Sequence, residues 1–371
     1  MKTITLSANT SWYLYNFRKS TILRFIKDGY RVVCISPNDE YTLDLINLGC
    51  EWFDLRMSNK GNNPLKDIRI IFRLIYLYIK IKPKAAFHFT IKNNIYGTWA
   101  AYFTKIPAIN NISGLGTAFI RKGIISNIVK KLYKLSQPLA QKVYCQNEED
   151  YELLIRNNLV PKEKLYLLPG SGVDINRFTP SLRVKNNDLF RFLFVGRILS
   201  DKGIYELIEA FQAINKNKVI CNLWICGFTE VDNISAIPLK DIERWKNIQG
   251  VKWLQTTNKI EDILKDIDCM VLPSYREGMP RSLLEAGAMG LPSVTTNVAG
   301  CRHIIQNKIN GLICNPKDSE SLRLAMLEML DMKEIDRNKM STSSRRIIEE
   351  GFNEEFVIDA AVDALNSVSD Y

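Results

Sequence analysis

Short apolar strands alternate with helical patterns along this chain of 371 residues, and that alternation restricts the fold more than any other feature. Apolar segments indicate strands at residues 3–7, 31–35 and 85–89, and apolar residues at helical spacing indicate helices at residues 15–27, 42–48 and 94–104. Such alternation is typical of parallel sheets covered by helices, because each parallel connection must cross the sheet. We therefore predict an α/β fold.

A turn-rich segment, residues 168–187, divides this alternation into two halves. The pattern restarts after it with a strand at residues 190–196 and a helix at residues 204–214. A chain of this length is also too long for one typical domain. We predict an N-terminal domain over residues 1–175, a C-terminal domain over residues 185–350, and a final helical stretch, residues 351–371, that could cross back to the N-terminal domain or pack on the second.

The positive charge lies in the first half of the chain. The formal net charge is +10, and residues 1–180 hold 26 Lys and Arg against 13 Asp and Glu, whereas the remainder holds 24 against 27. Residues 56–142 contain 16 basic residues and one acid, Asp67. Such basicity indicates an anionic partner, which could be nucleic acid, a membrane surface or a phosphorylated substrate.

Two basic amphipathic stretches favour the membrane surface. Residues 65–82 and 120–142 mix aliphatic and aromatic residues with Lys and Arg at helical intervals, as helices that lie in a membrane interface do. Alternatively, they are ordinary crossover helices with solvated basic faces. The sequence contains no recognised nucleic-acid motif, signal peptide or membrane-spanning apolar run. We expect a cytoplasmic protein, peripheral on the inner face of the plasma membrane, that binds no nucleic acid.

Metal-binding patterns are weak. The eight cysteines are scattered without a C-x-x-C pair, and only two histidines, His88 and His303, are present. Asp266-Ile267-Asp268 matches a D-x-D metal signature but precedes a strand that we expect to be buried. We predict reduced thiols and no metal site.

A first chemical motif follows the strand at residues 190–196. Arg197 and Lys202 lie in a short loop between that strand and the next helix. Ligands of α/β proteins bind at the carboxyl ends of parallel strands, and a helix N-terminus offers free N–H groups to an anion. Two cations beside it could clamp a diphosphate. Alternatively, both residues are solvated on a surface loop.

A second motif follows a strand that we predict at residues 269–272. Glu277 lies in the loop, and Glu285 lies in the helix that Pro280 is expected to begin. The loop carboxylate can accept hydrogen bonds from sugar hydroxyls, and the helical one can bind a ribose diol. The backbone N–H groups of residues 278–281 lie at the positive end of that helix.

Together, Gly196-Arg197…Lys202-Gly203 and Glu277-Gly278-x-Pro280…Glu285 resemble the retaining GT-B glycosyltransferases of family four. The resemblance covers nearly the whole chain, including Gly170-x-Gly172-Val173-Asp174…Arg177-Phe178 and Asn310-Gly311-Leu312. The chain looks most like the bacterial enzymes that extend undecaprenyl-diphosphate-linked glycans, as in O-antigen and lipopolysaccharide synthesis. The segments that suggest this are residues 89–97, 114–117 and 298–302. The resemblance implies two Rossmann-like domains facing across a cleft.

The resemblance also implies roles for single residues. Arg197 and Lys202 would grip the donor diphosphate, Glu285 would hold the ribose, and backbone at residues 251–255 would contact the base. Glu277 would hold the donor sugar together with Gly278, Met279, Pro280 and Arg281. Arg197, Lys202 and Glu277 form the catalytic set.

The N-terminal domain would supply the other contacts. The loop at residues 8–12 would face the donor phosphates, with Asn9 and Ser11 where many relatives have a Gly-Gly loop. The acceptor would meet Lys92, Gly114, Gly116 and Thr117, although Lys92 could equally be a solvated loop lysine. We interpret His88 as structural.

The implied reaction moves a hexose or N-acetylhexosamine from a nucleotide diphosphate sugar to a lipid-linked saccharide, with retention and without a metal or other cofactor. The donor is expected to be a UDP-sugar, with a GDP-sugar as the alternative. A transferase with a soluble acceptor, a GT-B-like nucleotide-sugar epimerase and a nucleic-acid-binding protein remain as alternatives.

Overall fold

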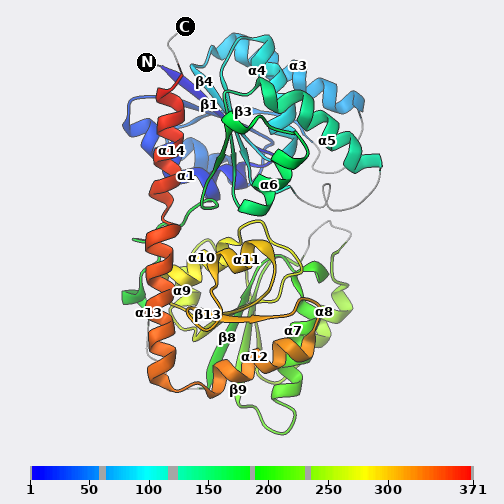
Figure 1. Ribbon diagram of the computed structural model, residues 1–371, viewed down its shortest axis with the longest axis vertical. Coiled ribbons are helices and arrows are strands. Elements are labelled where there is room, and N and C mark those ends of the chain that lie inside the picture. Colours follow the sequence, from blue (N-terminus) through cyan, green and yellow to red (C-terminus); the bar gives the residue numbers. More distant parts are fainter. Residues whose placement is uncertain (1, 58–63, 116–123, 184–188, 230–234, 369–371) are drawn as a thin grey trace. The chain divides into compact units, whose positions relative to one another are not determined.

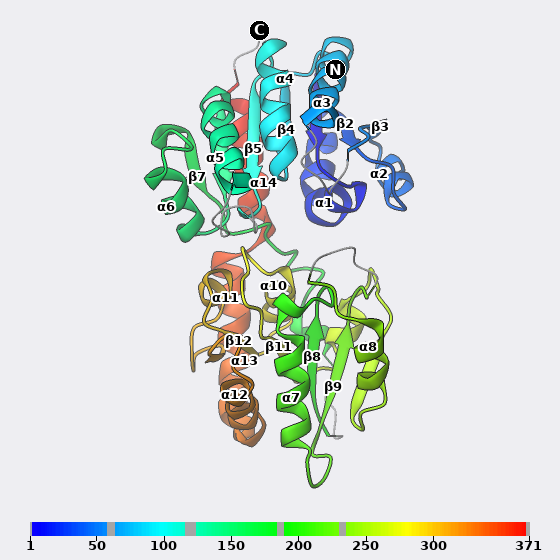
Figure 2. The ribbon, with the colours of Figure 1, turned by 90° about the vertical axis from the view of Figure 1, so that its right-hand side faces the viewer.

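The computed structural model describes residues 2–57, 64–115, 124–183, 189–229 and 235–368. The chain forms two compact units, which Figure 1 and Figure 2 show. The N-terminal unit comprises Met1–Ser171 and Glu354–Tyr371, and the C-terminal unit comprises Gly172–Asn353. Each unit is a parallel sheet flanked by helices, which confirms the predicted α/β class.

Within the described residues, the sheet of the N-terminal unit has seven parallel strands in the order β3-β2-β1-β4-β5-β6-β7. The strands are β1 (Thr3–Ser7), β2 (Arg31–Ser36), β3 (Glu51–Asp54), β4 (Ala85–Phe89), β5 (Ala108–Ile112), β6 (Lys142–Cys145) and β7 (Leu165–Leu167). The direction of strand order reverses between β1 and β4. The carboxyl ends of strands at such a reversal form the usual ligand site of open α/β sheets.

Helices cover both faces of this sheet because its strands are apolar on both sides. In β2, Val33 and Ile35 pack into one core, and Val32 and Cys34 pack into the other. The first core is covered by α3 (Pro64–Ile81), α4 (Thr98–Phe103), α5 (Ile124–Ser136) and α6 (Glu148–Arg156). The second is covered by α1 (Ser11–Lys27), α2 (Thr42–Asn47) and α14 (Glu354–Asn366).

The last helix, α14, is part of the N-terminal unit, although the whole C-terminal unit precedes it in the sequence. Val357, Ala364 and Leu365 are buried in the core that α1 also covers. The hydroxyl of Tyr144 on β6 donates a hydrogen bond to the carbonyl of Ala360 at 3.0 Å. The chain therefore crosses from the N-terminal unit into the C-terminal unit and, after completing it, ends in the N-terminal unit again.

In the described part of the C-terminal unit, six parallel strands lie in the order β10-β9-β8-β11-β12-β13. They are β8 (Phe190–Val195), β9 (Cys221–Cys226), β10 (Val251–Leu254), β11 (Cys269–Leu272), β12 (Ser293–Thr296) and β13 (Gly311–Cys314). The helices are α7 (Ile204–Ile214), α8 (Leu239–Lys246), α9 (Glu261–Leu264), α10 (Arg281–Ala288), α11 (Ala299–Ile304), α12 (Ser319–Asp331) and α13 (Glu334–Gly351). Strand order reverses between β8 and β11, the two strands that precede the chemical motifs.

Arg345 on α13 fastens the segment that enters the C-terminal unit. Its guanidinium donates hydrogen bonds to the carbonyls of Phe178 and Ala288, both at 2.6 Å, and to the carbonyl of Ile175 at 3.1 Å. The side chain of Phe178 is fully buried in the core of this unit. Residues 175–178 are therefore held firmly against the C-terminal end of α10.

Two expectations from the sequence concern the state of the cysteines and the presence of membrane-spanning segments. All eight cysteines are free and buried. Among the described residues, no helix has both the length and the apolar character needed to cross a bilayer.

Candidate functional site

The two loop motifs of the C-terminal unit pack against each other at the carboxyl ends of β8 and β11. Gly203 has φ 70°, a left-handed conformation, and a Cβ at this position would lie 2.1 Å from the carbonyl oxygen of Pro273. Only glycine fits there. The backbone N–H of Tyr275 donates to the carbonyl of Asp201 at 2.9 Å. The loop before α7 and the loop after β11 are thus fixed relative to one another.

Lys202 and Glu277, one from each motif, are in contact. The Nζ of Lys202 lies 2.5 Å from Oε1 of Glu277, and the hydroxyl of Ser274 donates to the same oxygen at 2.7 Å. The lysine and glutamate side chains are only 16% and 11% exposed. The amide of Gly300 donates to the carbonyl of Glu277 at 3.2 Å, and a Cβ on Gly300 would meet the Gly278 carbonyl. Residues at the start of α11 therefore support the Glu277 loop.

Arg197 supplies a second cation at the same edge. It lies two residues after the end of β8 and is exposed, and its guanidinium forms no hydrogen bond or ion pair with the described residues. Lys202 already faces the Glu277 carboxylate, whereas Arg197 has no carboxylate partner among the described residues. A cation next to a shielded Lys–Glu pair suits an anionic ligand.

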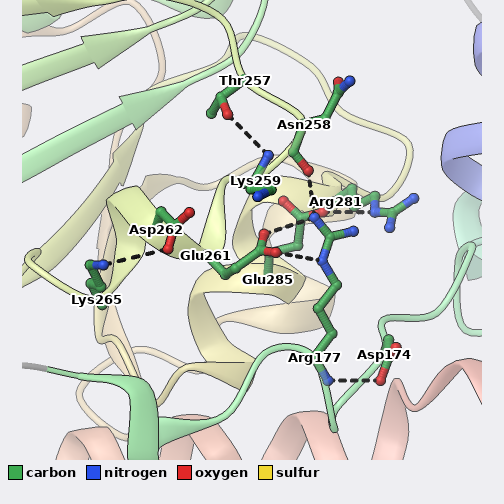
Figure 3. Close-up of polar contacts among 10 residues, drawn as sticks. All are labelled: Asp174, Arg177, Thr257, Asn258, Lys259, Glu261, Asp262, Lys265, Arg281 and Glu285. Carbon is green, nitrogen blue, oxygen red and sulfur yellow. Dashed lines mark hydrogen bonds and ion pairs between the residues drawn. The ribbon is translucent and has the colours of Figure 1, made fainter.

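Glu285 lies on α10, and its carboxylate is paired with an arginine of the same helix. The Nε of Arg281 donates to Oε1 of Glu285 at 2.8 Å, and the glutamate side chain is 13% exposed. Burial raises the pKa of Glu285, and the charges of Arg281 and Arg177 oppose that rise. Figure 3 shows these side chains with Glu261. The structure thus places the side chain of Arg281 beside the predicted ribose carboxylate.

One further residue of the second motif differs in detail from the prediction, and the structure adds a packing contact for another. Pro280 immediately precedes α10, so the helix begins at Arg281, one residue later than predicted. Its extended backbone, with ψ 113°, keeps it outside the first turn. Met279 packs partly buried against the apolar core, so its side chain stabilises the loop.

The N-terminal unit contains a pocket of about 300 Å³ at its own reversal of strand order. Asn9 follows β1, Lys92 follows β4 and Gly114 follows β5, and all three line this pocket. The structure thus brings together residues that the sequence analysis assigned separately to donor and acceptor. The other lining residues are Met57, Thr90, Ile91, Asn94, Ser113 and Tyr133.

The backbone beside this pocket is strained. Thr90 has φ 70°, which is costly for a β-branched residue. A π-helical turn, Asn93–Gly97, follows it. Both features concentrate at functional sites, where surrounding structure holds an unfavourable conformation in place.

Lys92 is held in place rather than loose on the surface. Its Nζ lies 2.8 Å from Oδ1 of Asp67, and the hydroxyl of Tyr96 donates to Oδ2 of the same carboxylate at 2.7 Å. The lysine side chain is 23% exposed. The sequence analysis did not identify Asp67 or Tyr96 as site residues, although Asp67 is the single acid in the most basic stretch of the chain.

His88 on β4 is a fully buried, neutral residue. Its ring nitrogens contact the Tyr78 hydroxyl and Oδ1 of Asn110, each at 2.8 Å. Burial lowers the pKa of His88 to about 4. Asn110 also donates to Gln137 at 2.8 Å, so a hydrogen-bonded polar layer supports the π-helical turn. These contacts agree with the structural interpretation of His88.

The structure places Ser11 away from the pocket. Its side chain is fully buried, and its hydroxyl contacts those of Ser36 at 2.8 Å and Thr42 at 3.0 Å. The residue that caps α1 is Thr10, whose hydroxyl accepts from the amide of Tyr13. Ser11 therefore stabilises the packing of α1 on β2 and α2, and we do not include it in the site. The predicted residues Gly116 and Thr117 lie outside the described residues.

The D-x-D sequence has a structural explanation. Oδ2 of Asp268 accepts from the backbone N–H of Arg191 at 2.8 Å, and the Asp266 carbonyl accepts from the Arg191 side chain at 3.3 Å. Asp268 thus anchors the start of β8. Over the described ranges, no three His, Cys, Asp or Glu residues cluster in a way that could hold a metal ion.

Comparisons with known proteins identify the family. Residues 179–347 match the family model described as glycosyl transferases group 1, and residues 3–147 match glycosyl transferase 4-like. The chain is 30% identical over 326 residues to the Campylobacter jejuni N,N'-diacetylbacillosaminyl-diphospho-undecaprenol α-1,3-N-acetylgalactosaminyltransferase, covering 83% of this chain and 84% of that protein. The chain belongs to the group 1 glycosyltransferases.

Two further comparisons extend this result. The glycosyltransferase is 28% identical over 303 residues to the Escherichia coli UDP-Gal:α-D-GlcNAc-diphosphoundecaprenol α-1,3-galactosyltransferase, covering 78% of this chain and 76% of that enzyme. It superposes on Anabaena HepE, solved in complex with UDP-glucose, with a TM-score of 0.80 and 14% identity over 99% of this chain and 100% of the other. The two parallel-sheet units therefore form a GT-B fold, which confirms the predicted fold class.

Gly203 provides a test of the loop packing. Gly203→Ala should lower the free energy of unfolding by about 2 kcal/mol or more, because it adds left-handed strain and a clash with the Pro273 carbonyl. Urea unfolding followed by circular dichroism measures this change. Gly351→Ala is the matched control, since nothing lies within 4 Å of a Cβ at that position. Equal stability of the two variants would contradict the packing described here.

Proposed function

We propose that this glycosyltransferase moves a hexose or N-acetylhexosamine from a UDP-sugar to a saccharide carried on undecaprenyl diphosphate, in the synthesis of a bacterial surface polysaccharide or glycan. The contact between Lys202 and Glu277 at the carboxyl ends of β8 and β11 carries this proposal. In this contact, the cation that we assign to the diphosphate, Lys202, lies next to the carboxylate that we assign to the sugar, Glu277. Two relatives with the names given above act on diphospho-undecaprenol-linked sugars, which supports the acceptor class.

On the donor side, Arg197 and Lys202 hold the diphosphate and Glu277 accepts hydrogen bonds from hydroxyls of the sugar. A lysine ammonium has three donors, so Lys202 can keep its contact with Glu277 while it binds a phosphate oxygen. Glu285 accepts hydrogen bonds from the ribose diol. The UDP-glucose complex of HepE supports UDP as the nucleotide.

The chemical step is a substitution at the anomeric carbon with retention. The bond from that carbon to the diphosphate oxygen breaks, a bond to the acceptor oxygen forms on the same face, and the acceptor proton passes to the departing diphosphate. Oε1 of Glu277 is occupied by Lys202 and Ser274, which favours sugar binding over nucleophilic attack. The protein lowers the barrier by stabilising the leaving group and by positioning the acceptor. Arg197 and Lys202 supply the charge, so we propose that no metal is required.

On the acceptor side, Lys92 meets the diphosphate of the lipid-linked saccharide. Its ammonium is held by Asp67, in a pocket with room for polar groups of the acceptor. Asn9 and the backbone at Gly114 contribute polar contacts from neighbouring strand ends.

Exposed apolar and basic residues on α3, α4 and α5 support docking to an anionic membrane. On α3, Ile68, Phe72, Tyr76 and Ile79 recur at helical spacing, and their exposure ranges from 46% to 66%. Tyr102 and Phe103 on α4, and Ile128 and Leu135 on α5, are also more than half exposed. Basic residues on the same helices are Arg69, Arg73, Lys80, Lys130, Lys131 and Lys134. We propose that this surface places the enzyme on the inner face of the plasma membrane, next to its lipid-linked acceptor.

Transfer assays test the donor assignments. With a UDP-sugar and undecaprenyl-diphosphate-linked N-acetylglucosamine, Arg197→Ala and Lys202→Ala should each lower turnover by about 10²–10³-fold, because each removes one charge from the leaving group. Lys246→Ala, which removes an exposed lysine of the same unit, should leave turnover unchanged. Mass spectrometry detects the product, and proton NMR of the new anomeric centre reports retention.

Three outcomes of these assays would count against the proposal. Near-normal turnover in folded Arg197 and Lys202 variants would show that these residues do not hold the donor diphosphate. Loss of activity in EDTA would contradict metal independence. Conversion of the nucleotide sugar without an acceptor, or transfer to a soluble saccharide alone, would favour the epimerase or the soluble-acceptor alternative.

The acceptor assignment is tested by Lys92→Ala. We expect the KM for the lipid-linked acceptor to rise about 10–100-fold, because a charged hydrogen bond to phosphate is lost, while the KM for the donor stays unchanged. Lys27→Ala, at the exposed end of α1, is the control. An unchanged acceptor KM, or an equal rise in both KM values, would show that Lys92 does not hold the acceptor.

Vesicle sedimentation tests the membrane surface. The protein should bind vesicles that contain phosphatidylglycerol and not vesicles of phosphatidylcholine alone. The double variant Phe72→Ser, Tyr76→Ser should weaken binding about tenfold or more, since each large apolar side chain contributes about 1.5–3 kcal/mol when buried. Phe356→Ser on α14, which covers the opposite face of the sheet, should have no effect. Equal binding of all three proteins would contradict this surface.

A further inference from the structure

Arg177 lies in the segment that enters the C-terminal unit. Hydrogen bonds and packing on both sides of it hold its backbone in place. Oδ1 of Asp174 accepts from the backbone N–H groups of Asn176 and Arg177, both at 2.9 Å. The next residue, Phe178, is fully buried, and its carbonyl accepts from Arg345. The Arg177 side chain therefore starts from a rigid base and extends toward α9 and α10 (Figure 3).

The guanidinium of Arg177 holds the loop between β10 and α9. Its Nε and Nη2 donate to the two carboxylate oxygens of Glu261 at 3.1 and 2.7 Å, and Nη2 also donates to the carbonyl of Asn258 at 2.6 Å (Figure 3). Glu261 begins α9, and Asn258 lies in the loop itself. At the start of this loop, the Cys226 thiol donates to the carbonyl of Gln255 at 3.4 Å. Arg177 is therefore the anchor of the loop's far end.

The same guanidinium lies beside Glu285, the proposed ribose carboxylate. The charged groups that act on Glu285 are Arg281 and Arg177, which favour its ionised form, and Glu261, which opposes it. Arg281 comes from the helix of Glu285 itself, whereas Arg177 comes from a separate segment. Burial raises the pKa of Glu285, and the two arginines partly oppose that rise.

We propose that Arg177 is a positioning residue of the donor-nucleotide site, which fixes the loop of residues 255–260 against α10 and supplies a second positive charge to Glu285. This inference rests on the proposed function, in which the loop contacts the base and Glu285 binds the ribose. Arg177 touches neither the diphosphate contacts nor the transferred sugar in this assignment. It acts on nucleotide affinity through the loop and through the carboxylate.

The two parts of this role can be separated by substitution. Arg177→Lys keeps the charge beside Glu285 but loses the planar fork that bridges Glu261 and Asn258. Arg177→Gln loses both. Glu261→Gln weakens the contact between Arg177 and the loop. It also removes a negative charge near Glu285, so it should not raise the pKa of Glu285.

The pH dependence of nucleotide affinity is the readout, because a purely structural role of Arg177 would not change it. UDP and GDP affinities are measured by titration calorimetry between pH 5.5 and 8.5 for the unaltered protein and each variant. All three variants should bind the preferred nucleotide about tenfold more weakly at pH 8. In Arg177→Gln the pKa of Glu285 rises further, so affinity should also fall as pH drops through that pKa, approaching tenfold per pH unit below it. Arg177→Lys and Glu261→Gln should keep the pH profile of the unaltered protein.

A matched control and the opposing outcomes complete the test. Arg323→Gln removes another arginine that pairs in two places with a glutamate, Glu320, on α12 of the same unit, and it should change neither affinity nor pH profile. Circular dichroism confirms that each variant is folded. If the unaltered protein binds neither nucleotide, the proposed donor site is wrong and this inference falls with it. If it binds, and folded Arg177→Gln binds equally well at every pH, only the role of Arg177 is overturned.

Discussion

Parallel strands force each connection to cross the sheet through a helix, so the loops that follow the strands all emerge at one edge. Both sheets of this chain obey that constraint, and both reverse strand order, between β1 and β4 in one unit and between β8 and β11 in the other. Every residue that we place in a site lies at, or is held against, one of these two edges. The close packing of the loops there, with Gly203 against Pro273 and Gly300 against Gly278, converts a general property of the fold into a fixed arrangement of charges.

The fold and the donor-side motifs could be predicted because their signals are local in the sequence. Apolar runs of strand length followed by helical spacing indicate a parallel sheet without any knowledge of distant contacts. Arg197, Lys202, Glu277 and Glu285 are likewise recognisable as residue types in strand–loop–helix context. The sequence could not show that Lys202 and Glu277 would touch, since that depends on two loops 75 residues apart meeting at adjacent strand ends.

The contacts that the sequence did not reveal are tertiary. The exception is the pair of Arg281 and Glu285, which lie four residues apart on one face of α10. Ser11 is buried because α1 packs on β2 and α2, and no local pattern marks that burial. The role of Asp67 was visible only as a lone acid among bases, and its meaning required the distance to Lys92. The strain at Thr90 has no sequence signature at all.

The position of α14 has a consequence for synthesis of the chain on the ribosome. The C-terminal unit is one continuous segment, so it can complete its sheet as soon as it has emerged. The N-terminal unit cannot, because part of the core beneath α1 comes from Val357 and Leu365. The first strands of this unit are translated first, but its core is completed last. One apolar side of α1 stays exposed while roughly half of the chain is translated. That surface is therefore open to aggregation for the time that translation of the second unit takes.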